Sequence, residues 1–310
     1  MNKKDDPRIR TLFIDDVDQI DCAIFDPSQG IIGQSWHVDV KVTGIPDDNG
    51  FVYDFGELKK LIKKVLKSTV DHSLLIPVLS TQIQYQETTS GELWKLKAKS
   101  PFIENDNDWE YRCPKGAVFP IRAINITKTL VERECTKLIR HRLPEYITDI
   151  QTTLRAEKAG PGASFIRYTH GISDHEGLCQ RPFHGHRSLV EIYVNDIKRI
   201  DLEQYVTHEV LGPTVHIASK SQLSNKSEKS TYRNSKSSSK SQTVKLSFKG
   251  TLGKYQALIP KDKIFFVENM TTIESISHHI LKIIEKREKT GSRIKITCYE
   301  GIGKGAIAEN

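Results

Sequence analysis

The chain has 310 residues, of which 37% are hydrophobic and 27% charged, and its formal net charge is +7. This length allows one large domain or two of about 150 residues, and no apolar run approaches the ~20 residues that span a membrane. The charged start MNKKDDPRIR lacks the apolar core of a secretory signal. Five scattered cysteines form no CxxC pair, which favours reduced thiols in a cytoplasm over a disulfide framework.

The first half of the chain predicts two helices and several strands. WHVDVKV (36–42) alternates as a strand with one buried face. After a turn at Asn49-Gly50, apolar residues recur at helical spacing from Leu58 to Leu66, which predicts an amphipathic helix. The segment 82–120 is polar and turn-rich, and we expect an irregular insertion there. A second amphipathic helix is predicted at about 127–141, followed by a strand in IQTTLRAE.

The second half predicts a strand in SLVEIYV, a helix in TTIESISHHILKIIEK and a strand in RIKITCYE. Between them, about 219–243, lies a Ser/Lys-rich tract that carries much of the positive charge. It has too few apolar residues to pack, so we expect a disordered loop. Because it lacks interleaved aromatics for stacking on single strands, a solvated loop is favoured over a nucleic-acid arm. Its charge could also attract an anionic substrate.

The two halves resemble each other. The order strand, strand, helix, strand occurs in both, with insertions at different points. FIDDVD from Phe13 matches FIRYTH from Phe165, and IIGQSWHVDVKV matches FHGHRSLVEIYV at the same interval. Independently, EKAGPGAS from Glu157 matches EGIGKGAI from Glu300. These matches predict an internal duplication.

A candidate metal site lies in the second half. In His184-Gly185-His186 the two imidazoles share one face of a strand, and His170 arrives from the neighbouring strand. Three histidines can hold zinc and leave a fourth position open. An isolated HxH pair is more often a chance occurrence. His175 lies between the motifs and could compete with His170 as a ligand, but the repeat register favours His170. In the ungapped register the first half has Asp18, Ile32 and Gln34 at the positions of the three histidines. Only the second copy is therefore expected to bind metal.

These motifs resemble the 6-pyruvoyl-tetrahydropterin synthase and 6-carboxy-tetrahydropterin synthase family. The resemblance rests on F-x(4)-H, a loop with Cys179 before HGH, the stretch DFGELKKLIKKVL…VDHSLL, TTIE, and a glutamate ending the last strand. It covers most of the chain as two copies, without 82–120 and the Ser/Lys tract. It implies an α+β fold of two tandem tunnelling-fold (T-fold) repeats, at 1–164 and 165–310, each an antiparallel sheet with helices packed on one face.

The resemblance also implies roles for individual residues. Zinc would be held by His170, His184 and His186. Cys179 would be the proton-abstracting base, and Asp71-His72 would assist proton transfer. Glu300 and Glu157 are both candidates to anchor the pterin ring, and the pair Thr271-Thr272, which resembles a pterin-contacting pair, slightly favours Glu300.

Each role has a structural alternative. Cys179 could be a small buried thiol, His72 could satisfy a helix end, and one of the two glutamates could be a surface residue. The first half has Pro27 at the place of the cysteine, and the second half has no clear DFxxLK…DH segment. Neither half can therefore form a full site alone. Since members of the family assemble sites between subunits, we expect a composite site in a homo-oligomer.

The expected function is that of a zinc-dependent lyase. It would convert 7,8-dihydroneopterin triphosphate into a 6-substituted tetrahydropterin with loss of triphosphate, the 6-carboxy product of a queuosine-type pathway being slightly favoured over the 6-pyruvoyl product. A non-catalytic or repurposed pterin-binding protein is the alternative, and a nucleic-acid-associated protein is a third. We expect a cytoplasmic protein with Zn²⁺ as cofactor and no membrane or nucleic-acid partner.

Overall fold

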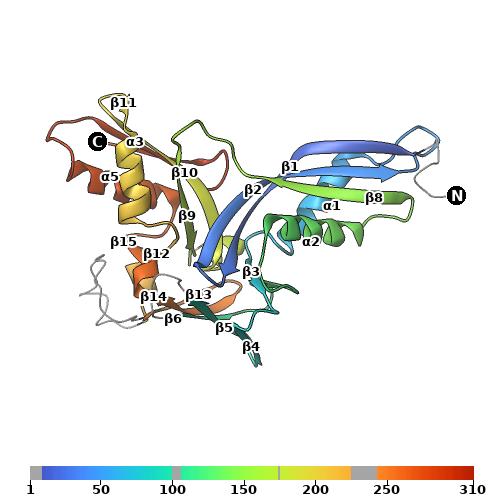
Figure 1. Ribbon diagram of the computed structural model, residues 1–310, viewed down its shortest axis with the longest axis horizontal. Helices are drawn as coiled ribbons and strands as arrows, with labels where there is room; N and C mark the ends of the chain where they lie inside the picture. The colour runs from blue at the N-terminus through green and yellow to red at the C-terminus, as the bar shows by residue number, and fades with distance from the viewer. Residues whose placement is uncertain (1–8, 100–105, 174, 225–242) are drawn as a thin grey trace.

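The computed structural model describes residues 9–99, 106–173, 175–224 and 243–310, and these residues form three sheets (Figure 1). In the first sheet the central strands β1 (Arg10–Asp26) and β2 (Gly30–Gly44) are antiparallel, whereas β3 (Leu74–Pro77) runs parallel to β1. The helices α1 and α2 pack on one face of this sheet through a shared apolar core. The strand order is β7 (Val118–Ile121), β3 (Leu74–Pro77), β1 (Arg10–Asp26), β2 (Gly30–Gly44) and β8 (Ile147–Arg155).

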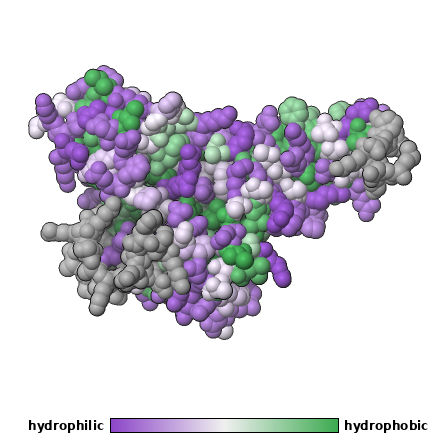
Figure 2. Space-filling model, viewed as in Figure 1, coloured by the Kyte–Doolittle hydropathy of each residue, from purple (hydrophilic) through white to green (hydrophobic). Residues whose placement is uncertain are grey.

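Both predicted helices of the first half are confirmed. α1 (Phe55–Lys67) begins where the Asp54 side chain accepts a hydrogen bond from the Glu57 amide, and it buries the apolar stripe that its sequence predicts. α2 (Lys128–Arg140) is capped in the same way by Thr127. Lysines follow the outer face of α1, and hydrophilic side chains cover most of the face of the molecule in Figure 2.

The second sheet repeats this plan. β12 runs parallel to β9 as β3 does to β1, and α5 (Ile273–Glu285) packs against the sheet as predicted. The second half has no DFxxLK segment, and a short helix takes the place of α1. This helix is α3 (Ile200–Gln204), which continues as a π-helix η3 (Tyr205–Val210). The order is β15 (Ile264–Val267), β12 (Val215–Ser219), β9 (Ser164–His170), β10 (His184–Val194), β16 (Ile294–Tyr299) and β17 (Gly305–Glu309), with β11 (Ile197–Lys198) paired to β10.

The predicted α+β class of two tandem repeats is confirmed, with parallel pairs at one edge of the first sheet and of the second. Short 3-10 helices complete the described secondary structure: η2 (Leu178–Gln180), η4 (Lys220–Gln222) and η5 (Lys261–Lys263). Among the described residues, no helix is both long and apolar enough to cross a membrane.

The described residues of the segment 82–120 lie mostly in strands, so the prediction of an irregular insertion is wrong for them. Alternation in β5 turns Trp94, Leu96 and Ala98 into an apolar core. β14 pairs with β6, so strands from both sides of the predicted boundary at 164 share one sheet. Its order is β13 (Thr243–Gly250), β14 (Gly253–Pro260), β6 (Asp106–Cys113), β5 (Gly91–Lys99) and β4 (Ile83–Thr88).

The prediction of a disordered loop at 219–243 is wrong at both ends of that range. Ser219 closes β12, Gln222 and Leu223 are buried, and Thr243 opens β13. Gln222 is fixed because its Nε2 donates to the Gly171 carbonyl at 2.7 Å. The remainder of the predicted loop, 225–242, lies outside the described residues.

The two repeats meet where β2 crosses β10, and glycine makes this approach possible. A Cβ atom on Gly33 would lie 2.2 Å from the Tyr168 carbonyl oxygen, and one on Gly185 would lie 2.6 Å from the Gly33 Cα. Neither position therefore has room for a side chain. The crossing places β1 and β2 of the first repeat against the strand that carries His184 and His186.

Strand pairing also corrects the register between the repeats. His170 pairs with His184, and Ile32 pairs with Ile24 rather than with Asp18. Ile24 is therefore the counterpart of His170. The ungapped match fails because a short turn joins β1 to β2, whereas the loop 171–183 joins β9 to β10.

Candidate metal and acid–base site

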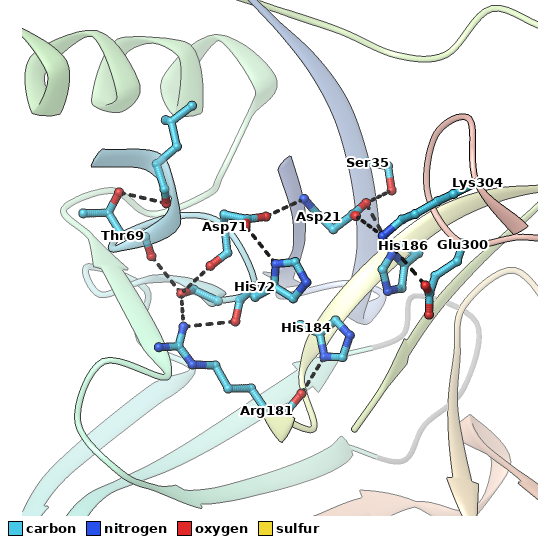
Figure 3. Close-up of polar contacts among 12 residues, drawn as sticks. Asp21, Ser35, Thr69, Asp71, His72, Arg181, His184, His186, Glu300 and Lys304 are labelled. Carbon is cyan, nitrogen blue, oxygen red and sulfur yellow. Dashed lines mark hydrogen bonds and ion pairs between the residues drawn. The ribbon is translucent and has the colours of Figure 1, made fainter. Parts of the chain in front are cut away.

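Three buried histidines converge at the ends of neighbouring strands. His170 closes β9, and His184 and His186 open β10 (Figure 3 shows the latter two). Each histidine is no more than 1% exposed, and one ligand atom from each lies within 4.8 Å of the others. The Nε2 atoms of His170 and His186 are 3.1 Å apart. His175, the competing candidate, is exposed and belongs to neither of the two groups of metal-ligating side chains found among the described residues.

An oxygen partner orients each ring from behind. The Nδ1 atom of His170 lies 2.6 Å from the Thr271 carbonyl oxygen, and that of His184 lies 2.7 Å from the Arg181 carbonyl oxygen. Because a carbonyl only accepts, these Nδ1 atoms carry the protons and leave the Nε2 lone pairs free. Burial holds the pKa of both rings well below the usual value, which keeps them neutral.

The third ring is oriented by a carboxylate from the other repeat. Asp21 on β1 places Oδ1 3.2 Å from Nδ1 of His186, and the same oxygen accepts a hydrogen bond from the Ser35 hydroxyl at 2.5 Å. Burial opposes ionisation of Asp21, but His186 and Ser35 prevail and lower its pKa to about 2. A carboxylate behind a histidine is a common outer contact of metal ligands.

This donor set fits zinc. Three buried imidazoles with an oxygen atom beside each Nδ1 can supply three protein ligands through Nε2 and leave a fourth position open, as catalytic zinc sites do.

A second group adjoins the histidines. His72, which follows α1, stacks on His184 with ring centroids 5.1 Å apart and 19° between planes. Ligand atoms of His72, Cys179 and His184 lie within 4.8 Å of one another. Nδ1 of His72 lies 2.9 Å from Oδ2 of Asp71. Burial disfavours the charged ring, but hydrogen bonds to Asp71 and Cys179 raise the pKa of His72 to about 10.

The backbone holds His72 in an unusual conformation. Its φ of 54° lies in the left-handed region, which costs a non-glycine residue on the order of 1 kcal/mol or more. Asp21 secures the conformation, because its carbonyl accepts from the His72 amide at 2.7 Å while its amide donates to Asp71 at 3.0 Å. Arg181 adds a bond from Nη1 to the His72 carbonyl at 3.1 Å (Figure 3).

The two candidate glutamates lie in different surroundings. Oε1 of Glu300 is 3.8 Å from Nε2 of His170, and Lys304 lies 3.7 Å from Oε2 of Glu300 and 3.8 Å from Asp21. Glu157 instead accepts a bond from Arg187 through its backbone carbonyl at 3.4 Å. Burial raises the pKa of Glu157 against the opposing charge of Arg187.

Thr271 and Thr272 have different structural roles. Thr271 is buried, its carbonyl meets His170, and its hydroxyl donates to the Gly171 carbonyl at 3.0 Å. Thr272 caps α5, where its hydroxyl accepts from the Ser275 amide. Thr271 thus supports a histidine, and Thr272 begins the helix that follows.

Sequence reasoning missed four residues that arrange the site: Asp21, Ser35, Arg181 and Lys304. Their positions depend on the crossing of β2 over β10 and on the fold of the loop before β10. Arg181 lies between Cys179 and the HGH motif, and Ser35 and Lys304 lie within the matched stretches IIGQSWHVDVKV and EGIGKGAI, but no spacing in the sequence singles them out.

Comparisons with known proteins find similarity to one family. Residues 21–99, which include Asp71 and His72, match the model of the family described as 6-pyruvoyl tetrahydropterin synthase. A curated relative from Pyrococcus abyssi (strain GE5 / Orsay), a putative 6-carboxy-5,6,7,8-tetrahydropterin synthase, is 23% identical over 119 residues. The family resemblance is confirmed. The matched region is 38% of this chain and spans 64% of the relative's length.

Solved structures of the same description are also similar to part of the chain. The 6-pyruvoyl tetrahydropterin synthase of Plasmodium falciparum is 16% identical, with a TM-score of 0.37, over 47% of this chain and 91% of that one. The synthase of Plasmodium vivax is 19% identical, with a TM-score of 0.31, over 47% of this chain and 98% of that one.

Proposed function

We propose that the chain is a zinc-dependent pterin synthase, a lyase that acts on 7,8-dihydroneopterin triphosphate and releases triphosphate. The observation that carries the proposal is the junction of two groups: three buried histidines with free Nε2 atoms, and a cysteine beside an Asp–His pair. The name of the matched family and that of the curated relative support the substrate class.

The metal would be held by Nε2 of His170, His184 and His186, which the oxygens behind them orient. When bound there, zinc would act as a Lewis acid on the hydroxyls of the pterin side chain and acidify the adjacent C–H bond.

The acid–base work would fall to Cys179, His72 and Asp71. A protonated His72 favours the thiolate of Cys179, which takes the proton from the substrate carbon. The proton then resides on sulfur and can be relayed through the His72 ring to another substrate atom. Asp71 keeps the ring charged and oriented.

Substrate orientation would depend on Glu300. A carboxylate can accept two N–H donors from the amino-pyrimidinone edge of a pterin, and Glu300 lies beside the histidines. We favour Glu300 over Glu157 as the anchor, with Thr271 and Thr272 at the edge of the site.

We further propose the 6-carboxy product over the 6-pyruvoyl product, because the curated relative is named for the former. A cytoplasmic homo-oligomer is the setting we infer: the five cysteines are free, and β8 and β17 leave sheet edges that a second copy would cover.

The test is turnover of 7,8-dihydroneopterin triphosphate by the zinc-loaded protein, with triphosphate release and product mass measured together. We expect one zinc per chain, release of triphosphate, and loss of turnover in Cys179→Ala. Tight pterin binding without triphosphate release would overturn the proposal in favour of a non-catalytic pterin-binding protein. A protein that bound neither zinc nor pterin would overturn the proposal altogether.

A further inference from the structure

The loop that carries Cys179 joins β9 to β10 and is closed on itself. The Ile172 amide donates to the Cys179 carbonyl at 2.9 Å. At the start of the loop, the Gly171 carbonyl accepts bonds from Gln222 at 2.7 Å and Thr271 at 3.0 Å. Residues distant in sequence therefore fix the start of the loop, and the backbone of Cys179 is tied to that start.

The side chain next to Cys179 is the strongest of these anchors. Gln180 is fully buried, and its Nε2 donates to the Gly177 carbonyl at 3.0 Å and to the Thr251 hydroxyl at 2.6 Å. Its Oε1 accepts from the Leu252 amide at 3.1 Å. Both amide hydrogens and the amide oxygen are thus used, two of the three partners belonging to the turn between β13 and β14.

The turn is shaped to receive this side chain. A Cβ atom on Gly250 would lie 1.9 Å from Oε1 of Gln180, so only glycine leaves room for the amide. Phe248 on β13 closes over the loop from another side, since a Cβ atom on Gly171 would lie 3.1 Å from its ring.

The β13–β14 hairpin is itself held by the first repeat. Gln256, Ala257 and Leu258 on β14 pair with β6, so β14 is an inner strand of the third sheet and β13 is its edge. We propose that Gln180 is a positioning residue, through which the third sheet holds the Cys179 thiol toward His72. This inference rests on the proposed function for the role of Cys179.

The experiment compares three variants of the zinc-loaded protein with the wild type. Gln180→Ala removes all three bonds, and Thr251→Val removes one of them at an exposed residue that cannot threaten the core. Thr251→Ser restores the hydroxyl. We expect kcat to fall about 10- to 100-fold in Gln180→Ala with KM changed by less than about threefold, since a displaced reacting group costs rate more than binding. In Thr251→Val kcat should fall several-fold, and in Thr251→Ser it should return to the wild-type value.

Hydrogen exchange of the peptide Cys179–Phe183 gives a readout that needs no turnover. We expect faster exchange in Gln180→Ala and Thr251→Val, with zinc content unchanged, and wild-type exchange in Ser247→Ala on the same hairpin. If the wild type does not turn over the pterin, the proposed function fails while exchange still decides the anchoring. Wild-type kcat in Gln180→Ala, unchanged exchange, or parallel loss of zinc would each overturn the inference.

Discussion

The carboxylate of Asp21 in the first repeat lies 3.2 Å from Nδ1 of His186 in the second. The backbone of the same residue bonds to both Asp71 and His72. One residue thereby fixes a candidate metal ligand and the proton-relay pair. The site is consequently a product of the contact between the repeats, and neither repeat alone contains it.

Asp21→Asn should weaken zinc binding about 10- to 100-fold, the usual effect of removing a carboxylate behind a metal-ligating histidine. The amide retains the size of the side chain but loses the charge that orients His186. Competition with a chromophoric chelator measures the affinity. Asp18→Asn is the matched control, because Asp18 lies on the same strand and approaches Lys63 instead. Equal affinities in the two variants would refute the role of Asp21.

The choice between the two glutamates can be decided by a pair of amide variants. Glu300→Gln should weaken pterin binding about tenfold or more, since hydrogen bonds to a charged group contribute roughly 1.5–3 kcal/mol. Glu157→Gln should change it by less than about twofold, because Glu157 lies beside Arg187. Calorimetric titration with a pterin measures both. The reverse order of effects would move the anchor to Glu157.

Burial of His216 predicts a dependence of stability on pH. His216 is 1% exposed, its Nδ1 lies 2.9 Å from the Thr169 hydroxyl, and burial lowers its pKa to about 3. Between pH 6.5 and 3 the unfolded chain therefore binds a proton at this residue that the folded chain does not. Stability falls as the pH drops through this window, by about 2–3 kcal/mol at pH 4.5 for this group.

Urea unfolding of the zinc-free protein at pH 7 and 4.5 measures this effect. His216→Gln keeps a polar partner for Thr169 without a titrating ring, so its loss of stability between the two pH values should be smaller by that amount. The other histidines contribute equally to both proteins and cancel. An identical pH dependence in the two proteins would show that His216 does not titrate as inferred.

The sequence predicts those features that depend on local pattern or on motifs. The apolar spacing in α1 and the HxH pair at the head of β10 are local patterns, and the sequence predicts both. The sequence does not predict the third sheet, although Trp94, Leu96 and Ala98 alternate, because the stability of this sheet depends on pairing β6 with a strand from the other half. Pairing between distant strands leaves little trace in a single sequence.

The register error has a related cause. An ungapped match assumes loops of equal length, whereas the cysteine loop before β10 is longer than the turn before β2. For the same reason Asp21 escaped notice: its importance appears only when β1 lies beside β10.

Mixing two inactive variants distinguishes a site within one chain from one shared between subunits. His72 and Cys179 come together in a single chain, so the composite site joins the two repeats of that chain. His72→Ala and Cys179→Ala should each lose at least about 100-fold in kcat, since each removes a member of the proton-transfer pair. Mixed oligomers, formed by co-expression with two affinity tags, should show no recovery, because every chain lacks one member. Recovery toward a quarter or half of wild-type turnover would place the pair on different subunits, and full turnover in either single variant would contradict the mechanism itself.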